Sequence, residues 1–461
     1  MSRRMRSAAR FGAQILTTLA AVAVLATVSF AQEDSTKKDR TAAWPSDRVN
    51  AQPVKVQHYR PNDIRGIGMF EAPKIDDVGY DGFVLQWNGS FTQQMQGLEH
   101  ENNATVRLGT GADSATNLNQ LIDIGTGANN AMANLSFDAQ IARGVRVELT
   151  SYLSTRHHNE TWVKDGYLLL DGSPWDIEML DNIMKVVTVK LGHYEINYGD
   201  MHYRRSDAGQ TFFNPLVGNL IMDAFTTEVG GEIMVRKNGL IGMFGLTGGE
   251  VRGQVLKPGD RKASILGKLG FDRHLREDLR VRLTGSLYTT QSSVNNTLYS
   301  GSRAGSRYYY VLENVKATES AQAWSGDVQP GYRDNVTAWV VNPYVEFKGI
   351  ELFGNIEQSS GRNQGELTDR DWSQYAGDAV YRFAKDQFYV AGRYCVAEGR
   401  FQGFTSDVSV DRTEVGGGWF LTPNALLKLE YVVQNYNDFP ANDIRHDGQF
   451  SGFMMEAAIS F

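Results

Sequence analysis

The sequence FSGFMMEAAISF, from Phe450 to Phe461, decides between the folds open to this chain. An extended chain places successive side chains on opposite faces, and here one face is apolar while the other is mixed. The first face carries Phe453, Met455, Ala457, Ile459 and Phe461, and the second carries Met454, Glu456, Ala458 and Ser460. Such a strand fits the edge of a soluble sheet. It also fits the closing strand of a membrane-spanning β-barrel, with its apolar face toward lipid and its polar face toward a lumen.

Residues 1–31 have the features of a signal peptide. Four arginines precede an apolar stretch at 15–28, and residues 29–31 (Ser-Phe-Ala) place small side chains where a signal peptidase reads them. A stretch of about 14 residues is short for a membrane-spanning helix, which needs about 20. We therefore expect export and cleavage before Gln32. Removal of four arginines and no acidic residue changes the net charge from −7 to −11, which argues against nucleic acid as a partner.

Short turns and long polar loops alternate along the rest of the chain. Period-2 patterns of apolar residues predict about 16 strands between residues 81 and 461. The predicted short turns lie at 143–144, 237–239, 273–278, 348–349, 384–386 and 422–424. An outer-membrane barrel has short periplasmic turns and long extracellular loops, whereas a soluble sandwich has no reason to collect its short turns at one end. An even strand count also leaves both termini in the periplasm.

We therefore predict an all-β protein in the bacterial outer membrane: a transmembrane antiparallel β-barrel over residues 81–461. Residues 32–80 show little periodicity and contain several prolines, so they are expected to form a periplasmic or lumen-lying extension. One short helix is expected from Ser173, as N-cap, to about Met184. The single cysteine, Cys395, excludes an intramolecular disulfide framework.

The segment between the predicted fifth and sixth strands, residues 191–236, is unusual for an extracellular loop. It is dense in tyrosines, charges and apolar side chains, which a solvated loop would not need. We expect it to fold into the lumen, with its apolar side on the wall and its polar side narrowing the channel. The candidate constriction residues are Glu195, Tyr198, Asp200, His202, Tyr203, Arg204, Arg205 and Asp207. A lid packed on neighbouring loops, without contact with solute, is the alternative.

The signal peptide, the strand pattern, this loop and the terminal phenylalanine resemble bacterial outer-membrane porins. The stretch YGDMHYRRSDAGQTFFNP, residues 198–215, is similar to the corresponding region of porins distantly related to the phosphate-selective porin family. The resemblance implies passive diffusion of small hydrophilic solutes, contact with outer-membrane lipid and often a homotrimer. It does not carry phosphate selectivity, because that needs a concentrated basic ladder and the mature chain is acidic.

Cationic residues also fall at positions that face the predicted lumen. They are Arg280, Arg282, Arg382, Arg393, Arg412 and Lys428. Opposite acidic residues of the inserted loop, they could create a transverse field that orients dipolar solutes. The equally weighted alternative is ion pairing inside the wall with Glu346, Glu357, Glu414 and Glu430.

Signals for an enzyme are weak. The sequence His-His-Asn-Glu at 157–160 lacks a further metal-ligating set, and no phosphate-binding glycine loop or nucleophile elbow is present. We expect no metal, no cofactor and no catalytic residue. Two alternatives to a porin stay open: a non-conducting barrel, such as an adhesin or structural protein, with its lumen plugged by 32–80 and 195–225, and a barrel-embedded lipid hydrolase.

Overall fold

The computed structural model describes residues 39–74, 78–155, 162–206, 211–248, 262–301, 307–319 and 324–461. Several predictions lie outside these residues: the signal peptide at 1–31, the start of the extension at 32–38, the His-His-Asn-Glu sequence and Asp207.

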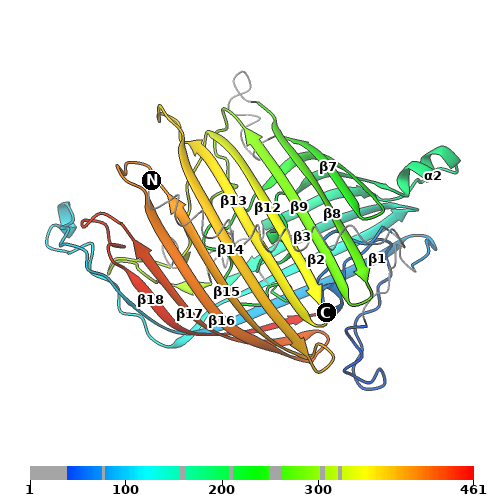
Figure 1. Ribbon diagram of the computed structural model, residues 1–461, viewed down its shortest axis with the longest axis horizontal. Coiled ribbons are helices and arrows are strands. Elements are labelled where there is room, and N and C mark those ends of the chain that lie inside the picture. Colours follow the sequence, from blue (N-terminus) through cyan, green and yellow to red (C-terminus); the bar gives the residue numbers. More distant parts are fainter. Residues whose placement is uncertain are drawn as a thin grey trace.

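The described chain forms a closed antiparallel barrel of 16 strands, as predicted (Figure 1). Each strand pairs with its neighbours in the chain, and β9 pairs with β12 across a long connection that holds the small β10–β11 sheet. The first nine strands are β1 (Val84–Glu101), β2 (Gly127–Ala142), β3 (Val145–Ser154), β4 (Trp162–Leu170), β5 (Val187–Glu195), β6 (Thr227–Lys237), β7 (Leu240–Thr247), β8 (Ser264–Arg276) and β9 (Leu279–Thr290). The others are β10 (Tyr308–Tyr309), β11 (Trp324–Ser325), β12 (Asn335–Phe347), β13 (Ile350–Arg362), β14 (Arg370–Phe383), β15 (Phe388–Gly399), β16 (Val408–Thr422), β17 (Ala425–Asn437) and β18 (Gln449–Ser460).

The barrel closes where the last strand pairs with the first. The β1–β18 register runs from Ser90 opposite Ser460 to Glu101 opposite Gln449. Inside this seam the Gln94 Nε2 donates to Glu456 Oε1 at 2.7 Å. The pairing confirms the prediction that the carboxyl-terminal stretch is the closing strand.

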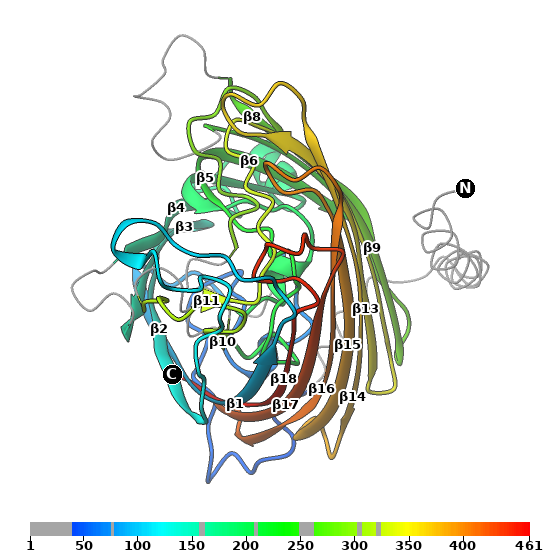
Figure 2. The same ribbon diagram turned by 90° about the vertical axis from the view of Figure 1, so that its left-hand side faces the viewer.

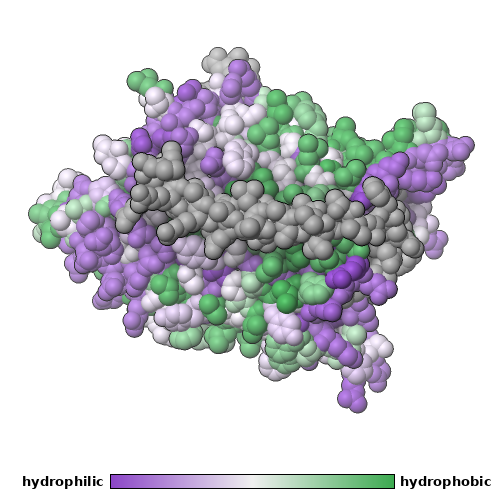
Figure 3. All heavy atoms as spheres, viewed as in Figure 1, coloured by the Kyte–Doolittle hydropathy of each residue, from purple (hydrophilic) through white to green (hydrophobic). Residues whose placement is uncertain are grey.

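The two faces of β18 are those that period 2 predicts. Phe453 and Ile459 are 57% and 48% exposed on the outside, while Met454 and Glu456 are fully buried inside. Most of the other strands repeat this alternation, whereas β4 and β5 show it only weakly. On the face seen in Figure 3, apolar residues lie between the two ends and hydrophilic residues gather toward the ends. An apolar outer band around a closed barrel is the surface that a bilayer requires. Among the helices of the described residues, none is long and apolar enough to cross a membrane.

Tight turns occupy one end of the barrel, called here the turn end, and long connections occupy the other, the loop end. The predicted Asn-Gly hairpin between β6 and β7 is present, with φ of 51° at Asn238 and 74° at Gly239, as a type I′ turn requires. Short turns face the periplasm in outer-membrane barrels, which orients the molecule.

The β4–β5 connection is the exception at the turn end, because it contains the helix α2 (Glu178–Met184). The predicted helix start at Ser173 is wrong. The Ser173 hydroxyl instead accepts from the Trp175 amide at 3.2 Å in a turn before the helix. Arg143 of the β2–β3 turn holds this turn by donating to the carbonyl oxygens of Ser173 and Trp175, so the helix begins later.

The interior of the barrel is filled by three segments rather than left open. They are residues 56–71 and the described parts of two connections, the loop after β5 and the β9–β12 connection, whose strands β10 and β11 lie within the ring in Figure 2. Short 3-10 turns occur in these segments at Ile64–Gly66 and Met201–Tyr203, and another, Gly111–Asp113, lies in the β1–β2 loop. The three interior segments position the candidate site.

Candidate functional site

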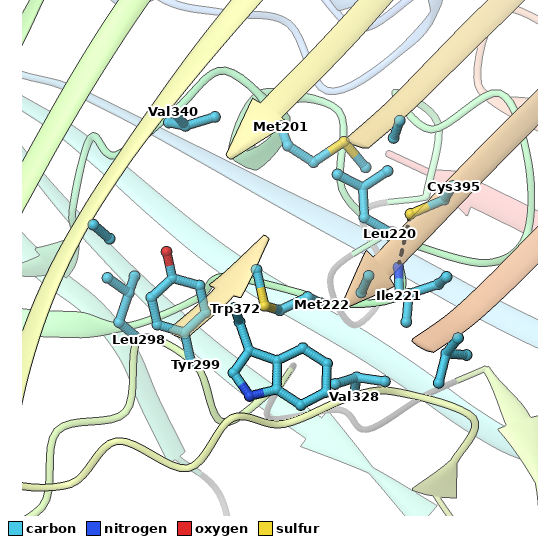
Figure 4. Packing of buried hydrophobic residues seen from close by; sticks show 14 of the residues in the cluster. Met201, Leu220, Ile221, Met222, Leu298, Tyr299, Val328, Val340, Trp372 and Cys395 are labelled. Atoms are coloured by element: carbon cyan, nitrogen blue, oxygen red, sulfur yellow. Dashed lines mark hydrogen bonds between the residues drawn. The ribbon is translucent and has the colours of Figure 1, made fainter. Parts of the chain in front are cut away.

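The connection between β5 and β6, residues 196–226, is called here the inserted loop, and its described parts, 196–206 and 211–226, lie in the barrel interior. Their apolar side packs on the wall and on the β9–β12 connection (Figure 4). Leu220 and Ile221 are 2% and 0% exposed. The backbone is held by the Ile221 amide, which lies 3.5 Å from Cys395 Sγ, and by the Met222 amide, which donates to Gln374 Oε1 at 2.7 Å. The loop is therefore built into the core.

Asp200 is the electrostatic centre of the inserted loop. Its carboxylate accepts two hydrogen bonds of 2.8 Å from Arg282, one of 2.7 Å from Thr284, and lies 2.7 Å from Lys268 Nζ. The side chains of Asp200, Arg282 and Lys268 are all fully buried. Burial raises the pKa of Asp200, but the charges of Lys268 and Arg282 outweigh it and hold this pKa below its usual range. The loop is thus ionically bonded to β8 and β9.

Two neighbouring arginines bind acidic groups in different directions. Arg204 lies 3.6 Å from Glu351 and 3.8 Å from Asp378 on the wall. Arg205 lies 3.1 Å from Glu195, at the end of β5, and stacks 3.8 Å from the centre of the Phe225 ring. Arg204 therefore ties the loop to the wall, and Arg205 ties it both to the end of β5 and to its own residue Phe225.

The aromatic candidates make mainly packing contacts and hydrogen bonds. The hydroxyls of Tyr198 and Tyr299 lie 3.1 Å apart, and Tyr299 donates to Glu357 at 2.7 Å. The His202 Nε2 lies 3.0 Å from the side-chain oxygen of Asn197. The Tyr203 ring lies 3.8 Å from the His202 ring. Six of the eight constriction candidates therefore lie in the inserted loop, and a seventh, Glu195, lies beside it at the end of β5. The eighth, Asp207, lies outside the described residues.

The six cationic wall candidates face inward and find partners at short range. Arg280 pairs with Asp272 and Arg282 with Asp200. Arg382 pairs with Glu351, Arg393 with Asp378 and Lys428 with Glu456, and Arg412 donates to the Asn219 carbonyl. Of the four acidic partners expected from the sequence, Glu414 lies 3.6 Å from Arg393. Glu346 lies instead 3.5 Å from Arg40, Glu357 accepts from Tyr299, and Glu430 accepts from the Val217 amide.

Sequence reasoning missed the contribution of two other parts of the chain. Lys268 has the inward parity of its strand and could have been found from that alone. Glu71 could not, because residues 32–80 carry no periodic pattern that places them in the lumen. Its carboxylate accepts two bonds, of 2.6 and 2.8 Å, from Arg282, and so completes the charge cluster around Asp200.

A cavity of about 1270 Å³ opens at the turn end. Its lining includes cationic and anionic side chains and the stretch from Ile67 to Glu71. We call it the periplasmic vestibule. Two other cavities, beside the seam and beside the inserted loop, measure only about 10 and 20 Å³. Water and small solutes therefore have room on the periplasmic side of the inserted loop, while the described side chains around the loop are closely packed.

A substitution of Lys428 tests whether the buried ionic contacts are needed for the stability of the fold. Its Nζ lies 2.6 Å from Glu456 Oε2 and donates to the carbonyl oxygens of Thr211 and Leu216, all in a buried position. Lys428→Met leaves the Glu456 charge buried, so we expect a loss of about 3–5 kcal/mol in the free energy of unfolding, measured by urea titration in detergent. Lys348→Met, at a site 66% exposed, should change it by less than about 0.5 kcal/mol. An equal loss of unfolding free energy in the two variants would contradict the assignment of Lys428 to a buried ion pair with Glu456.

Among the described residues, no group of three or more His, Cys, Asp or Glu side chains could hold a metal ion. The chemistry that the arrangement offers is ionic and hydrogen-bonding contact around a water-accessible vestibule.

The comparisons with known proteins bear on the fold. No protein-family model and no curated protein sequence matches the chain significantly. Among solved structures, the chain is similar to an anion-selective porin from Comamonas acidovorans, with a TM-score of 0.50 and 12% identity over 82% of this chain and 100% of that one. It is also similar to the outer membrane channel DcaP of Acinetobacter baumannii (TM-score 0.49, 10% identity, 82% and 98% covered). A third is OmpT, an outer membrane protein of Vibrio cholerae in its trimer form (0.48, 10%, 83% and 100%).

At these identities the likeness concerns the fold. The chain has the fold of bacterial outer-membrane porins, a closed 16-stranded barrel with an apolar outer band. The resemblance to the phosphate-selective family stays a prediction.

Proposed function

We propose that the protein is an outer-membrane porin, a passive diffusion channel for small hydrophilic solutes or ions. The observation that carries the proposal is the inserted loop. It enters the barrel from the loop end and lies across the interior, with the periplasmic vestibule of about 1270 Å³ on its far side. A loop that is held inside a 16-stranded barrel by charged side chains of both the loop and the wall can set the size and charge of a channel.

Within this proposal the constriction lies between the inserted loop and the wall. The loop supplies Asp200 and the wall supplies Arg282 and Arg393, so charges of opposite sign face each other there. Solutes pass when the side chains around the loop separate enough to admit water. The proposal includes the homotrimer that the resemblance to porins implies. Native mass spectrometry tests this oligomeric state.

A specific observation also favours a second function, that of a non-conducting barrel with a plugged lumen. Asp200, Lys268 and Arg282 are fully buried, and the cavity beside the inserted loop measures about 20 Å³. A structural or adhesive barrel needs an interior of this kind and no path for solutes.

Planar-bilayer recording separates the two functions. If the protein is a porin, the purified full chain inserts with stable, stepwise conductance that depends on salt concentration. Arg393→Gln should then change the ratio of cation to anion permeability, because Arg393 is buried at the wall between Asp378 and Glu414. Arg276→Gln, exposed at the turn end, is the matched control and should leave the ratio unchanged. Absence of any conductance step, with barrel folding verified by circular dichroism, would overturn the porin and favour the plugged barrel.

A further inference from the structure

Residues 56–71, called here the strap, lie inside the turn end of the barrel. Val56, Ile64 and Phe70 are at most 2% exposed. One side of the strap, from Ile67 to Glu71, contributes to the lining of the periplasmic vestibule. The other side meets the inserted loop, so the strap separates the vestibule from the candidate constriction.

The strap and the inserted loop contact each other through both polar and apolar groups. Arg60 Nη2 donates to the Tyr203 carbonyl oxygen at 3.0 Å, and its guanidinium lies 3.8 Å from the centre of the Phe213 ring. Ile64 and Ile67 belong to one buried cluster with Phe212 and Leu216 of the loop. The two segments therefore pack as one body.

Arg282 of β9 joins this body to the barrel wall. It donates two hydrogen bonds to Asp200 of the inserted loop, both of 2.8 Å, and two to Glu71 of the strap, of 2.6 and 2.8 Å. A planar guanidinium binds two carboxylates in this way with fixed geometry. Its side chain is fully buried, so neither ion pair is exchanged readily for water. We call the group Glu71–Arg282–Asp200 the latch.

We propose that the strap is a second, periplasmic gate of the channel and that the latch couples its position to that of the inserted loop. The strap has to leave the turn end before solute can pass from the constriction into the vestibule. Breaking the contact between Glu71 and Arg282 loosens the strap, while the inserted loop keeps its bonds from Asp200 to Arg282. The gating part of this inference rests on the proposed function, whereas the coupling part does not.

The test uses a protease recognition sequence inserted between Gly79 and Tyr80. Both residues are exposed, and a Cβ built on Gly79 meets no atom within 4 Å. The full chain is folded, cut and examined by size-exclusion chromatography at increasing urea, which reports when the amino-terminal fragment leaves the barrel. Glu71→Gln and Arg282→Met are compared with Arg276→Met, an exposed arginine near the same hairpin. Glu71→Gln keeps Arg282 paired with Asp200 and Asp272, so this variant retains the barrel if Arg282→Met does not fold.

We expect the fragment to leave at lower urea in both latch variants and at unchanged urea in the control. Release at the same urea concentration in these three variants and in the otherwise unaltered cut protein would overturn the coupling. In bilayers, the cut Glu71→Gln protein should open more often than the cut control, and equal opening would overturn the gate. If no variant conducts even after the fragment has left, the porin function fails while the chromatography still decides the coupling.

Discussion

Gly452→Ala is expected to prevent or strongly destabilise closure of the barrel. Gly452 lies in β18 at the seam, with a φ of +145° that other residues rarely adopt. A Cβ there would lie 2.1 Å from the Gly97 carbonyl oxygen and 2.9 Å from the Leu98 Cα, both backbone atoms of β1. Strain and clash together should lower the free energy of unfolding by about 3 kcal/mol, as measured by urea titration followed by tryptophan fluorescence.

Gly377→Ala is the matched control for this seam variant. Gly377 lies in mid-strand on β14, and a Cβ built there meets nothing within 4 Å. Its substitution should change the unfolding midpoint little, because an added methyl group has free space. A Gly452→Ala protein as stable as Gly377→Ala would show that the β1–β18 pairing is not formed as described.

The second large effect is expected when the inserted loop loses its apolar anchors. Leu220 and Ile221 are almost completely buried between the wall and the β9–β12 connection. The double variant Leu220→Ala/Ile221→Ala should lower the free energy of unfolding by about 2–4 kcal/mol per site. Since this packing holds the loop across the interior, the single-channel conductance should rise and limited proteolysis should cut the loop sooner.

Its control is Leu269→Ala/Ile265→Ala, which removes the same two kinds of side chain from the outer surface. Leu269 and Ile265 are 73% and 45% exposed and face detergent or lipid. This control should keep the conductance of the unaltered protein. If the loop variant is destabilised but its conductance stays the same, the inserted loop does not set the constriction.

The strand pattern was predictable because it depends on short-range chemistry. The alternation along Phe450–Phe461, the Asn238-Gly239 turn and the even number of strands follow from period 2 and turn preferences, which tertiary packing did not override here. The helix start was not predictable in the same way, because Arg143, from a turn 30 residues earlier, holds the Ser173 carbonyl.

The candidate site was predictable as a set of residues but not as a geometry. Asp200 and Arg282 are both found from the sequence, one as a loop residue and one as a lumen-facing residue. Their direct contact depends on how deeply the loop enters, which is set by the packing of Leu220 and Ile221. The role of Glu71 depends on a contact across 211 positions of sequence, and nothing near Glu71 in the sequence encodes that.

The segment of residues 39–74, which includes the strap, also affects how the barrel folds. It bonds to strands on both sides of the seam: the Lys55 amide donates to Gln86 of β1, and the Trp44 ring nitrogen donates to the Leu421 carbonyl of β16. Residues so far apart in the chain meet only at a high entropic cost, and a segment that touches both sides lowers that cost. We therefore expect refolding without this segment to be slower and the folded barrel to be less stable.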